Sequence, residues 1–369
     1  MRLGLDLLYL IPGVVGGTET YATGLLPALR AIDKDDEFTV YVNREAAEWP
    51  LPDGFRRVVC PFMGSRRGAR YCFQQVHLPA LLRRDAIDLV HSLGYVGPLR
   101  TLCARVATVH DLNYRAFGHE MPVVRRRALE FFVGMTVRRA DAIIADSEFT
   151  RSELVAAFGV SRAPFVMVPL AARPRPARTD EQRAAERAGL GLPSSYVLAF
   201  GGSTPNKNLP RLLDAFARAR SRGLAQELVI VGRTPAHLAE EAHSGVRLAG
   251  YLGEVALDAV LSGADVLIVP SIYEGFGLVL LEAMEAGVPI VCSSRAALPE
   301  VAGDAAVYFD PYNVEGMASR ILEVGGDPER RQALRHRGGE RVRGYSWQRT
   351  AQETLKVYRD VLASRWAAR

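Results

Sequence analysis

The chain has 369 residues, of which 49% are hydrophobic and 24% are charged, and its formal net charge is +5. This balance is typical of a globular protein of about two domains and excludes a disordered chain, a collagen or a disulfide scaffold. No apolar stretch is long enough to span a membrane. The four cysteines form no C-x-x-C pair, which fits a reducing cytoplasm.

Short apolar runs alternate with helix-length segments along the first half of the chain. This alternation predicts a parallel β-sheet with helices on both faces. The expected strands are residues 3–10, 38–42, 89–91, 105–109 and 142–145, and the expected helices are 22–32, 123–140 and 148–158.

The composition changes at residues 171–194, which contain several prolines and many charges but no hydrophobic period. This change predicts a domain boundary near these residues. A second α/β series follows. Its expected strands are 196–200, 228–231, 246–248, 266–269, 289–292 and 307–309, and its helices are 209–219, 256–262, 279–286 and 314–324, with a basic helix at about 347–369.

The predicted fold is therefore α/β, with two doubly wound, Rossmann-like domains that face each other across a central cleft. The first would span residues 1–172 and the second 173–346, with the helix at 347–369 a candidate to pack back on the first. Ligands of such sheets bind beyond the carboxyl ends of the strands, so we expect functional residues on the loops that follow strands.

The most informative loop is Ser271–Gly277, between a buried strand and a helix. Its glycines allow main-chain N–H groups to approach a ligand, and the start of a helix favours an anion. Glu274 on the loop and Glu282 on the helix could both face one pocket, where a carboxylate can grip the vicinal diol of a sugar. The alternative for Glu282 is a solvated side chain favoured by the helix dipole.

This segment resembles the E-x7-E motif of the family-4 retaining glycosyltransferases. The match covers Glu274-Gly275-Phe276-Gly277, Glu282, Ala283, Gly287 and Pro289, and residues 298–306 are also similar. The resemblance implies the GT-B fold, with Glu274 on the donor hexose, Glu282 on the nucleotide ribose, and the amides of Gly275, Phe276, Gly277 and Leu278 on the diphosphate and sugar.

A second loop, Phe200 to Asn208, contains Gly201, Gly202 and Lys207, one of only three lysines in the chain. An ammonium group there suits a diphosphate that gains charge as it leaves, although a turn with a solvated lysine would look the same. Gly201-Gly202 stands where the family often has an arginine. It is similar to a mannosyltransferase subgroup with a G-G-x-x-x-x-K-N loop, which leaves open the source of a second positive charge.

In the first half, Gly16 and Gly17 lie in a glycine loop between the first strand and a helix. They could cradle a phosphate, or Thr18 or Glu19 could be an ordinary helix cap. His110 and Asp111 end a strand, and the resemblance favours His110 as the group near the sugar and reaction centre. Ser147 is expected to cap the helix that follows.

Two charged segments suggest other partners. Residues 122–140 contain five arginines and one glutamate with aromatic residues between them, which allows a basic amphipathic helix on an anionic membrane; the alternative is a core helix with solvated arginines. The acidic run at 33–37 lies at the wrong end of its sheet for a metal site, so a metal-independent site without cofactor is predicted.

The expected function is transfer of a hexose, with retention of configuration, from a nucleotide diphosphate donor to an acceptor hydroxyl. The catalytic set would be His110, Lys207 and Glu274. GDP-mannose is the favoured donor, with UDP- or dTDP-sugars next, and the acceptor is a glycan, a lipid-linked sugar or a small molecule. A sugar-nucleotide epimerase of the same fold is the first alternative. A nucleic-acid-binding protein is disfavoured, because no aromatic residues interleave with the basic ones in a recognisable module.

Overall fold

The computed structural model describes residues 1–159, 163–202, 204–236, 238 and 244–367. The chain forms two compact units. Unit 1 consists of Met1–Ala171 and Ser346–Arg369, and unit 2 of Ala172–Tyr345. The boundary therefore lies beside the one expected at residue 172, and the last helix belongs to unit 1.

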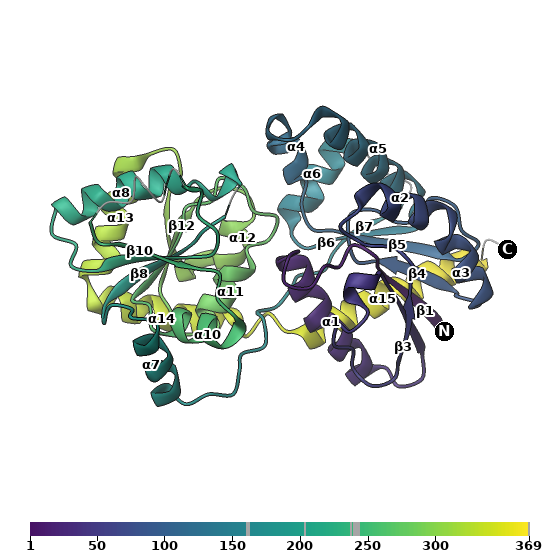
Figure 1. Ribbon diagram of the computed structural model, residues 1–369, viewed down its shortest axis with the longest axis horizontal. Coiled ribbons are helices and arrows are strands. Elements are labelled where there is room, and N and C mark those ends of the chain that lie inside the picture. Colours follow the sequence, from purple (N-terminus) through teal and green to yellow (C-terminus); the bar gives the residue numbers. More distant parts are fainter. Residues whose placement is uncertain (160–162, 203, 237, 239–243, 368–369) are drawn as a thin grey trace. The chain divides into compact units, whose positions relative to one another are not determined.

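Within the described residues, unit 1 is built on a seven-stranded sheet in the order β3-β2-β1-β4-β5-β6-β7, in which neighbouring strands run parallel. Helices α1 and α15 cover one face, and α2 and α5 lie on the other (Figure 1). The strands are β1 Arg2–Leu7, β2 Glu37–Val42, β3 Phe55–Val59, β4 Leu89–Ser92, β5 Ala104–Val109, β6 Ala142–Ala145 and β7 Phe165–Met167. The helices are α1 Gly17–Ile32, α2 Arg67–Val76, α3 Leu78–Arg84, α4 Asn113–Ala116, α5 Val123–Arg139, α6 Glu148–Phe158 and α15 Trp347–Ala367.

The described part of unit 2 contains a six-stranded parallel sheet in the order β10-β9-β8-β11-β12-β13. Its strands are β8 Tyr196–Phe200, β9 Glu227–Val231, β10 Val246–Gly250, β11 Val266–Val269, β12 Ile290–Ser293 and β13 Ala306–Phe309. The helices are α7 Asp180–Gly189, α8 Leu209–Ser221, α10 Glu254–Ser262, α11 Leu278–Glu285, α12 Leu298–Ala302, α13 Val314–Gly326 and α14 Pro328–Val342.

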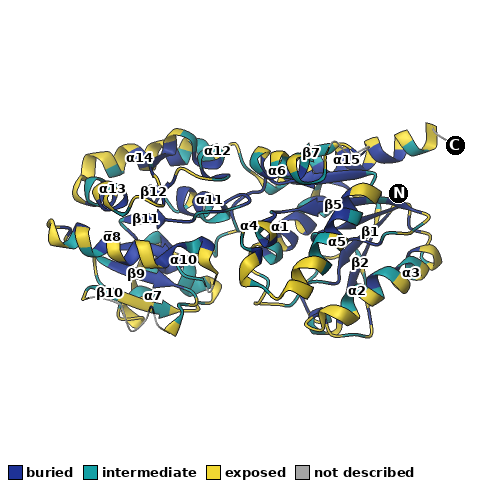
Figure 2. Cartoon of the chain, turned by 90° about the horizontal axis from the view of Figure 1, so that it is seen from above, coloured by how far each residue is buried: buried dark blue, intermediate teal, exposed yellow. Residues whose placement is uncertain are grey.

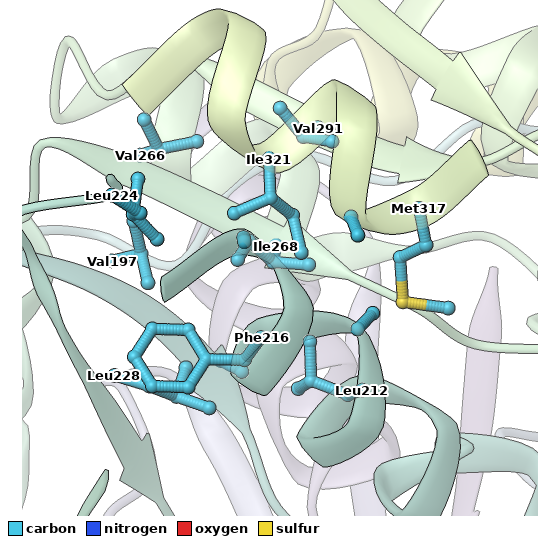
Figure 3. Packing of buried hydrophobic residues seen from close by; sticks show 14 of the residues in the cluster. Val197, Leu212, Phe216, Leu224, Leu228, Val266, Ile268, Val291, Met317 and Ile321 are labelled. Atoms are coloured by element: carbon cyan, nitrogen blue, oxygen red, sulfur yellow. The ribbon is translucent and has the colours of Figure 1, made fainter. Parts of the chain in front are cut away.

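The central strands of both sheets are buried on both sides, whereas the edge strands β3, β7 and β10 are only partly buried, and most helices bury one side (Figure 2). In unit 2, Phe216 of α8 and Ile321 of α13 pack on strand residues such as Val197 and Ile268 (Figure 3). Each such side chain, fully buried, contributes about 1.5–3 kcal/mol of transfer free energy. This packing holds the sheet rigid, and its strand ends carry the loops considered below.

The expected strands are all present, but the first is shorter than predicted, and one helix near the domain boundary was not predicted. The first strand ends at Leu7 rather than at residue 10, because the chain turns there with the Leu10 amide bonded to the Leu7 carbonyl. Residues 171–194, which show no hydrophobic period, nevertheless contain α7, which buries no residue. It starts at a capping box in which Thr179 and Gln182 exchange side-chain bonds with each other's backbone.

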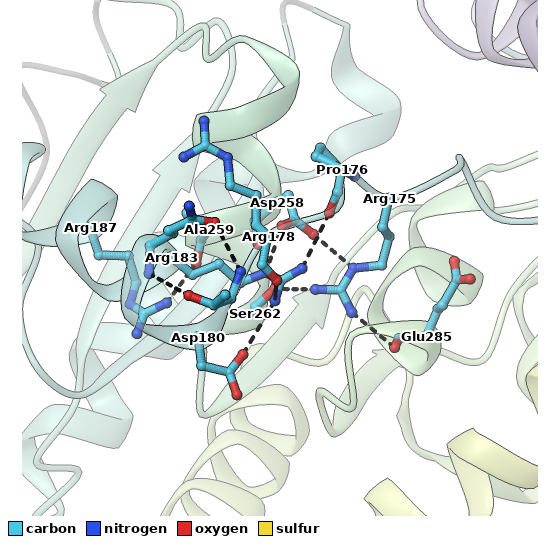
Figure 4. A network of polar contacts seen from close by, with 12 residues as sticks. Arg175, Pro176, Arg178, Asp180, Arg183, Arg187, Asp258, Ala259, Ser262 and Glu285 are labelled. Carbon is cyan, nitrogen blue, oxygen red and sulfur yellow. Dashed lines mark hydrogen bonds and ion pairs between the residues drawn. The ribbon is translucent and has the colours of Figure 1, made fainter.

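Helix α7 is held to unit 2 by charge rather than by apolar packing. Asp258 of α10 accepts hydrogen bonds of 2.7 Å from both Arg175 and Arg183 (Figure 4). Arg175 also donates to the Ser262 hydroxyl at 2.6 Å and to the Glu285 carbonyl at 3.2 Å. The segment that leads from unit 1 into α7 is thereby fixed along α10 and the end of α11.

Among the described residues, no helix has the length and apolar character needed to cross a bilayer.

Candidate active site

The loops that follow β8 and β11 are joined to each other at the carboxyl edge of the unit 2 sheet. The Asn206 side chain donates to the Tyr273 carbonyl at 3.1 Å, and the Ile272 amide donates to the Asn206 carbonyl at 2.8 Å. Asn208, which has a left-handed φ of 54°, donates to the carbonyls of Pro270 and Pro311. These buried bonds fix the position of Lys207 between the two asparagines.

Lys207 and Glu274 form an ion pair, with Lys207 Nζ 2.7 Å from Glu274 Oε1. The Ser271 hydroxyl donates to the same oxygen at 2.7 Å. Both charged side chains are mostly shielded, with 27% and 17% exposed. Gly202 lies against the lysine stem, because a Cβ there would be 2.9 Å from Lys207 Cγ. The structure thus brings together three residues that the sequence analysis singled out.

Gly275 and Phe276 are buried between this ion pair and the start of α11. Gly277 is the residue before the helix, with φ 96° and ψ 51°, and Leu278 is its first residue. The N-cap residue Gly277 makes no side-chain cap hydrogen bond at this end. As at any helix start, the first amides lack an intrahelical acceptor, and such an end can bind an anion. The Phe276 ring packs edge-on against Tyr345 at 6.1 Å, which makes it an anchor for the loop.

Glu282 lies within α11, and its side chain is 14% exposed. Its Oε1 is 3.6 Å from Arg173 Nε, a residue that the sequence analysis did not single out. Burial raises the pKa of Glu282, the charge of Arg173 opposes this rise, and Glu285 adds to it. The contact of Glu282 in the described structure is with Arg173, so this carboxylate is not part of the Lys207–Glu274 pair.

A hollow of about 620 Å³ lies at the carboxyl ends of β9 and β10. It adjoins the glycine loop after β8, since the Gly201 amide donates to the Val231 carbonyl at 2.7 Å. Tyr251, which is 72% exposed, contributes an aromatic surface to it. Its lining is Gly232, Arg233, Thr234, Pro235, Leu248, Gly250 and Tyr251.

In unit 1, Gly16 has φ 60° and precedes α1, of which Gly17 is the first residue. Neither Thr18 nor Glu19 is the N-cap. Instead, one Glu19 oxygen accepts from the Gly13 amide at 2.8 Å and the other from the Trp49 indole at 3.2 Å. Glu19 thus holds the glycine loop closed, and the helix start carries no side-chain cap.

His110 follows β5 and is 9% exposed. Its Nδ1 is 2.7 Å from Asp146 Oδ2, and its Nε2 is 3.0 Å from the Leu93 carbonyl. The Tyr21 ring of α1 lies edge-on to the imidazole at 4.9 Å. Asp111 instead accepts from the Asn113 amide in the following turn. Asp146 was not predicted as a site residue, although it directly follows the predicted strand 142–145.

Both ring nitrogens of His110 face acceptors, so the site favours the doubly protonated imidazolium. Burial, the largest single influence, lowers the pKa of His110, but the charge and hydrogen bond of Asp146 and the Leu93 carbonyl together raise it above its ordinary value. Asp146 Oδ1 has no hydrogen-bond partner among the described residues. When it is protonated, His110 can donate to Asp146 from Nδ1 and to the Leu93 carbonyl from Nε2.

The raised pKa of His110 predicts a pH-dependent stability of unit 1. Because the protonated ring favours the fold, its contribution is complete below the unfolded value of about 6.5 and is lost as the pH rises through the folded value. Asp146→Asn should remove this pH dependence and should lower the free energy of unfolding by about 1–3 kcal/mol at about pH 6.

All three tryptophans, Trp49, Trp347 and Trp366, belong to unit 1. Urea unfolding followed by tryptophan emission therefore reports on this unit. Equal pH slopes in the parent chain and in Asp146→Asn would contradict the assignment.

The remaining sequence expectations have these outcomes. Ser147 caps α6 as predicted, accepting from the Thr150 amide at 3.0 Å. The acidic run at 33–37 is a turn before β2, at the amino ends of the strands. In the described ranges no group of three or more His, Cys, Asp or Glu could hold a metal ion. Helix α5 is not amphipathic along its length, because only its second half buries a face, from Val133 to Val137.

Known proteins match this chain in both units. Residues 15–172 match the family model described as Glycosyltransferase Family 4, and residues 194–327 the model described as Glycosyl transferases group 1. Over 307 residues the chain is 30% identical to the MMP alpha-(1->4)-mannosyltransferase of Mycolicibacterium hassiacum, covering 76% of this chain and 72% of that protein. Over 290 residues it is 29% identical to the O-antigen chain mannosyltransferase B of Escherichia coli, covering 75% of each.

Among solved structures, sucrose-phosphate synthase from Thermosynechococcus elongatus superposes with a TM-score of 0.77 at 19% identity, covering 99% of this chain and 100% of that one. The two parallel-sheet, Rossmann-like units are thus those of the GT-B fold, the class of glycosyltransferases that the sequence predicts. Within that class, the chain belongs to glycosyltransferase family 4 and is similar to its mannosyltransferases.

Proposed function

We propose that this glycosyltransferase moves mannose from GDP-mannose to an acceptor hydroxyl with retention of anomeric configuration. The observation that carries the proposal is the Lys207–Glu274 ion pair beside the uncapped start of α11. It sets an ammonium group, a carboxylate and helix amides at one edge of a parallel sheet, where such folds bind nucleotides. The similarity to mannosyltransferases supports the choice of sugar.

The donor would lie along the carboxyl edge of the unit 2 sheet. The diphosphate would meet the amides of Gly275, Phe276, Gly277 and Leu278, with the ammonium group of Lys207 beside it. Glu274 would hold the hexose, and Glu282 the ribose once Arg173 releases it. The hollow lined by Arg233 and Tyr251 has the position and aromatic surface that suit the base.

In the proposed reaction the diphosphate leaves as the acceptor hydroxyl attacks from the same face of the sugar. Lys207 and the helix amides stabilise the charge that develops on the leaving group, which is the main catalytic contribution. The leaving phosphate takes the proton of the acceptor hydroxyl. No step requires a metal ion, and metal independence stays a prediction.

Unit 1 would present the acceptor. Gly16 and Gly17 would cover the donor phosphate and the acceptor, and His110 would donate from Nε2 to a sugar hydroxyl after releasing the Leu93 carbonyl. A glycan, a lipid-linked sugar and a small molecule are the acceptor classes. A cytoplasmic location, with the membrane reached through residues 122–140, is part of the same proposal.

Thermal shift with GDP-, UDP-, ADP- and dTDP-sugars tests the donor, because a bound ligand stabilises the fold by mass action. GDP-mannose is expected to give the largest shift. Slow transfer of mannose to water, followed by NMR, should release sugar with the anomeric configuration of the donor. Release of the opposite anomer would contradict retention. A larger thermal shift with a UDP- or dTDP-sugar would identify that sugar nucleotide as the donor instead of GDP-mannose. Conversion of the donor alone to an isomer would indicate an epimerase.

A further inference from the structure

Each glutamate of the E-x7-E segment is paired with one cation in unit 2. Glu274 Oε1 is 2.7 Å from Lys207 Nζ, and Glu282 Oε1 is 3.6 Å from Arg173 Nε. Each pair joins one positive and one negative group, so these four side chains together carry no net charge. The two cations can therefore act on an anionic ligand only when the two carboxylates take other partners.

Glu282 is too well shielded to be left without a partner, since its side chain is 14% exposed. Burial raises the pKa of this carboxyl group, and the charge of Arg173 opposes the rise, so the guanidinium favours the ionised form. The two hydroxyls of a ribose can replace the guanidinium, because both can donate hydrogen bonds to a carboxylate. In the same way, hydroxyls of a hexose can replace Lys207 on Glu274. A nucleotide sugar would thus exchange two ion pairs for two sugar contacts and two available cations.

The position of Arg173 suits it to a diphosphate at the start of α11. Glu282 is four residues beyond the first residue of α11, so its ion pair lies about 6 Å along the helix from those first amides. The backbone beside Arg173 is fixed to the same helix, because Arg175 donates to the Glu285 carbonyl at 3.2 Å and to Asp258 of α10 at 2.7 Å (Figure 4). The exchange therefore requires movement of the Arg173 side chain alone.

We propose that Arg173 is the second cation of the diphosphate site, released from Glu282 when the ribose of the donor takes that carboxylate. The loop from Phe200 to Asn208 supplies Lys207 but contains no arginine. Glu254 is a second acid near Arg173, but at 3.9 Å and with a side chain that is 69% exposed it holds the guanidinium weakly.

The chemistry of the two cations is complementary. A guanidinium group can bind two phosphate oxygens at once, whereas the Lys207 ammonium group is a compact point charge. Together they would stabilise the charge that develops on the diphosphate as it leaves. The inference rests on the proposed function, since it requires a nucleotide sugar at this edge of the sheet.

Titration calorimetry with GDP and with 2′,3′-dideoxy-GDP tests the exchange, because only GDP has the ribose hydroxyls that can take Glu282 from Arg173. Arg173→Gln should weaken the binding of GDP by about tenfold and change the binding of dideoxy-GDP by less than about twofold. Arg178→Gln, at an exposed position of the same segment, makes the same change of net charge and should leave both affinities unchanged.

Steady-state sugar release tests the catalytic role of Arg173. Arg173→Gln should lower kcat by about 10²-fold, because the guanidinium acts on charge that develops in the transition state. Arg173→Lys keeps a cation and should recover about tenfold of this loss. A purely structural arginine would change the thermal stability of unit 2 without separating the two nucleotides.

Three results would overturn the proposal. Equal weakening of both nucleotides by Arg173→Gln would show that the guanidinium acts independently of the ribose. Tighter binding of GDP would show that the ion pair only competes with the donor, and a kcat within about twofold of the parent value would remove Arg173 from catalysis. Failure of the proposed donor gives a different result, in which another nucleoside diphosphate stabilises the parent chain more than GDP. The same comparison is then made with that nucleotide and its dideoxy form.

Discussion

Lys207→Ala and Glu274→Ala are each expected to lower turnover by about 10²-fold, a loss of about 3 kcal/mol of transition-state stabilisation. The ammonium group and the carboxylate lie 2.7 Å apart at the end of the sheet, where unit 2 would bind the diphosphate and the hexose. Removing either one leaves the other without its partner and misplaced for the donor. The measurement is steady-state sugar release from GDP-mannose, with transfer to water as the minimal reaction.

The same pair provides an internal control. Because the two groups act together, the double variant should lose about as much activity as either single variant, not the product of the two losses. Lys356→Ala in α15 and Glu329→Ala in α14 remove the same side chains elsewhere and should leave turnover within about twofold. Near-normal turnover in both single variants would remove these residues from the catalytic set.

Gly277→Ala is expected to destabilise unit 2 by about 2–4 kcal/mol and to abolish the thermal shift by the donor. Gly277 has a φ of 96°, and a Cβ there would be 2.8 Å from Leu298 Cδ2. The substitution therefore adds backbone strain and a steric overlap at the residue that aims the first amides of α11. Differential scanning calorimetry with and without GDP-mannose measures both effects.

A substitution at Gly287, at the other end of α11, separates the cost of backbone strain from the cost of steric overlap. It also has a positive φ, of 69°, but a Cβ there would meet no atom within 4 Å. Gly287→Ala should therefore cost only the backbone strain, about 1–2 kcal/mol, and keep the donor response. Because Leu298 is fully buried, Leu298→Ala is itself destabilising, but the Gly277→Ala, Leu298→Ala double variant should lose less stability than the sum of the two single variants. Equal effects of the two glycine substitutions would show that the overlap at Leu298 is unimportant.

The success of the strand predictions depended on burial. Strands such as β8 and β11 lie inside a parallel sheet and are continuous apolar runs, so their predicted bounds agree with the structure. β3 and β7 are edge strands and were missed. β3 contains Arg56 and Arg57, and β7 has only three residues, none of them buried. A strand with one open edge needs no apolar run, and its pattern does not separate it from a loop.

The site residues also divide into two groups: those that a local sequence pattern predicts, and those that only the tertiary fold brings together. The glycine-containing loops that follow two of the strands predict ligand binding, and they contain Lys207, Glu274 and Gly277. The structure places Lys207 and Glu274 in contact. Asp146 was within reach of the sequence, because it ends the strand next to that of His110. Arg173 could not be predicted, because no local pattern connects it with Glu282. The two side chains come together because Asp258, on another helix, fixes the proline-rich segment that contains Arg173. For α5, the alternative of a core helix with solvated arginines holds in part, because its second half packs on the core and the arginines of its first half are exposed.

The return of α15 to unit 1 has a consequence for biosynthesis. Unit 2 is complete once Tyr345 has been made, whereas unit 1 still awaits a helix that buries Ala351, Leu355 and Tyr358. The Tyr358 hydroxyl is also the partner of His91 Nδ1, at 2.6 Å in the interior. On the ribosome, the domain that is synthesised first should therefore mature last, reversing the usual order of co-translational folding. Until then the nascent chain displays an apolar surface that a chaperone would recognise.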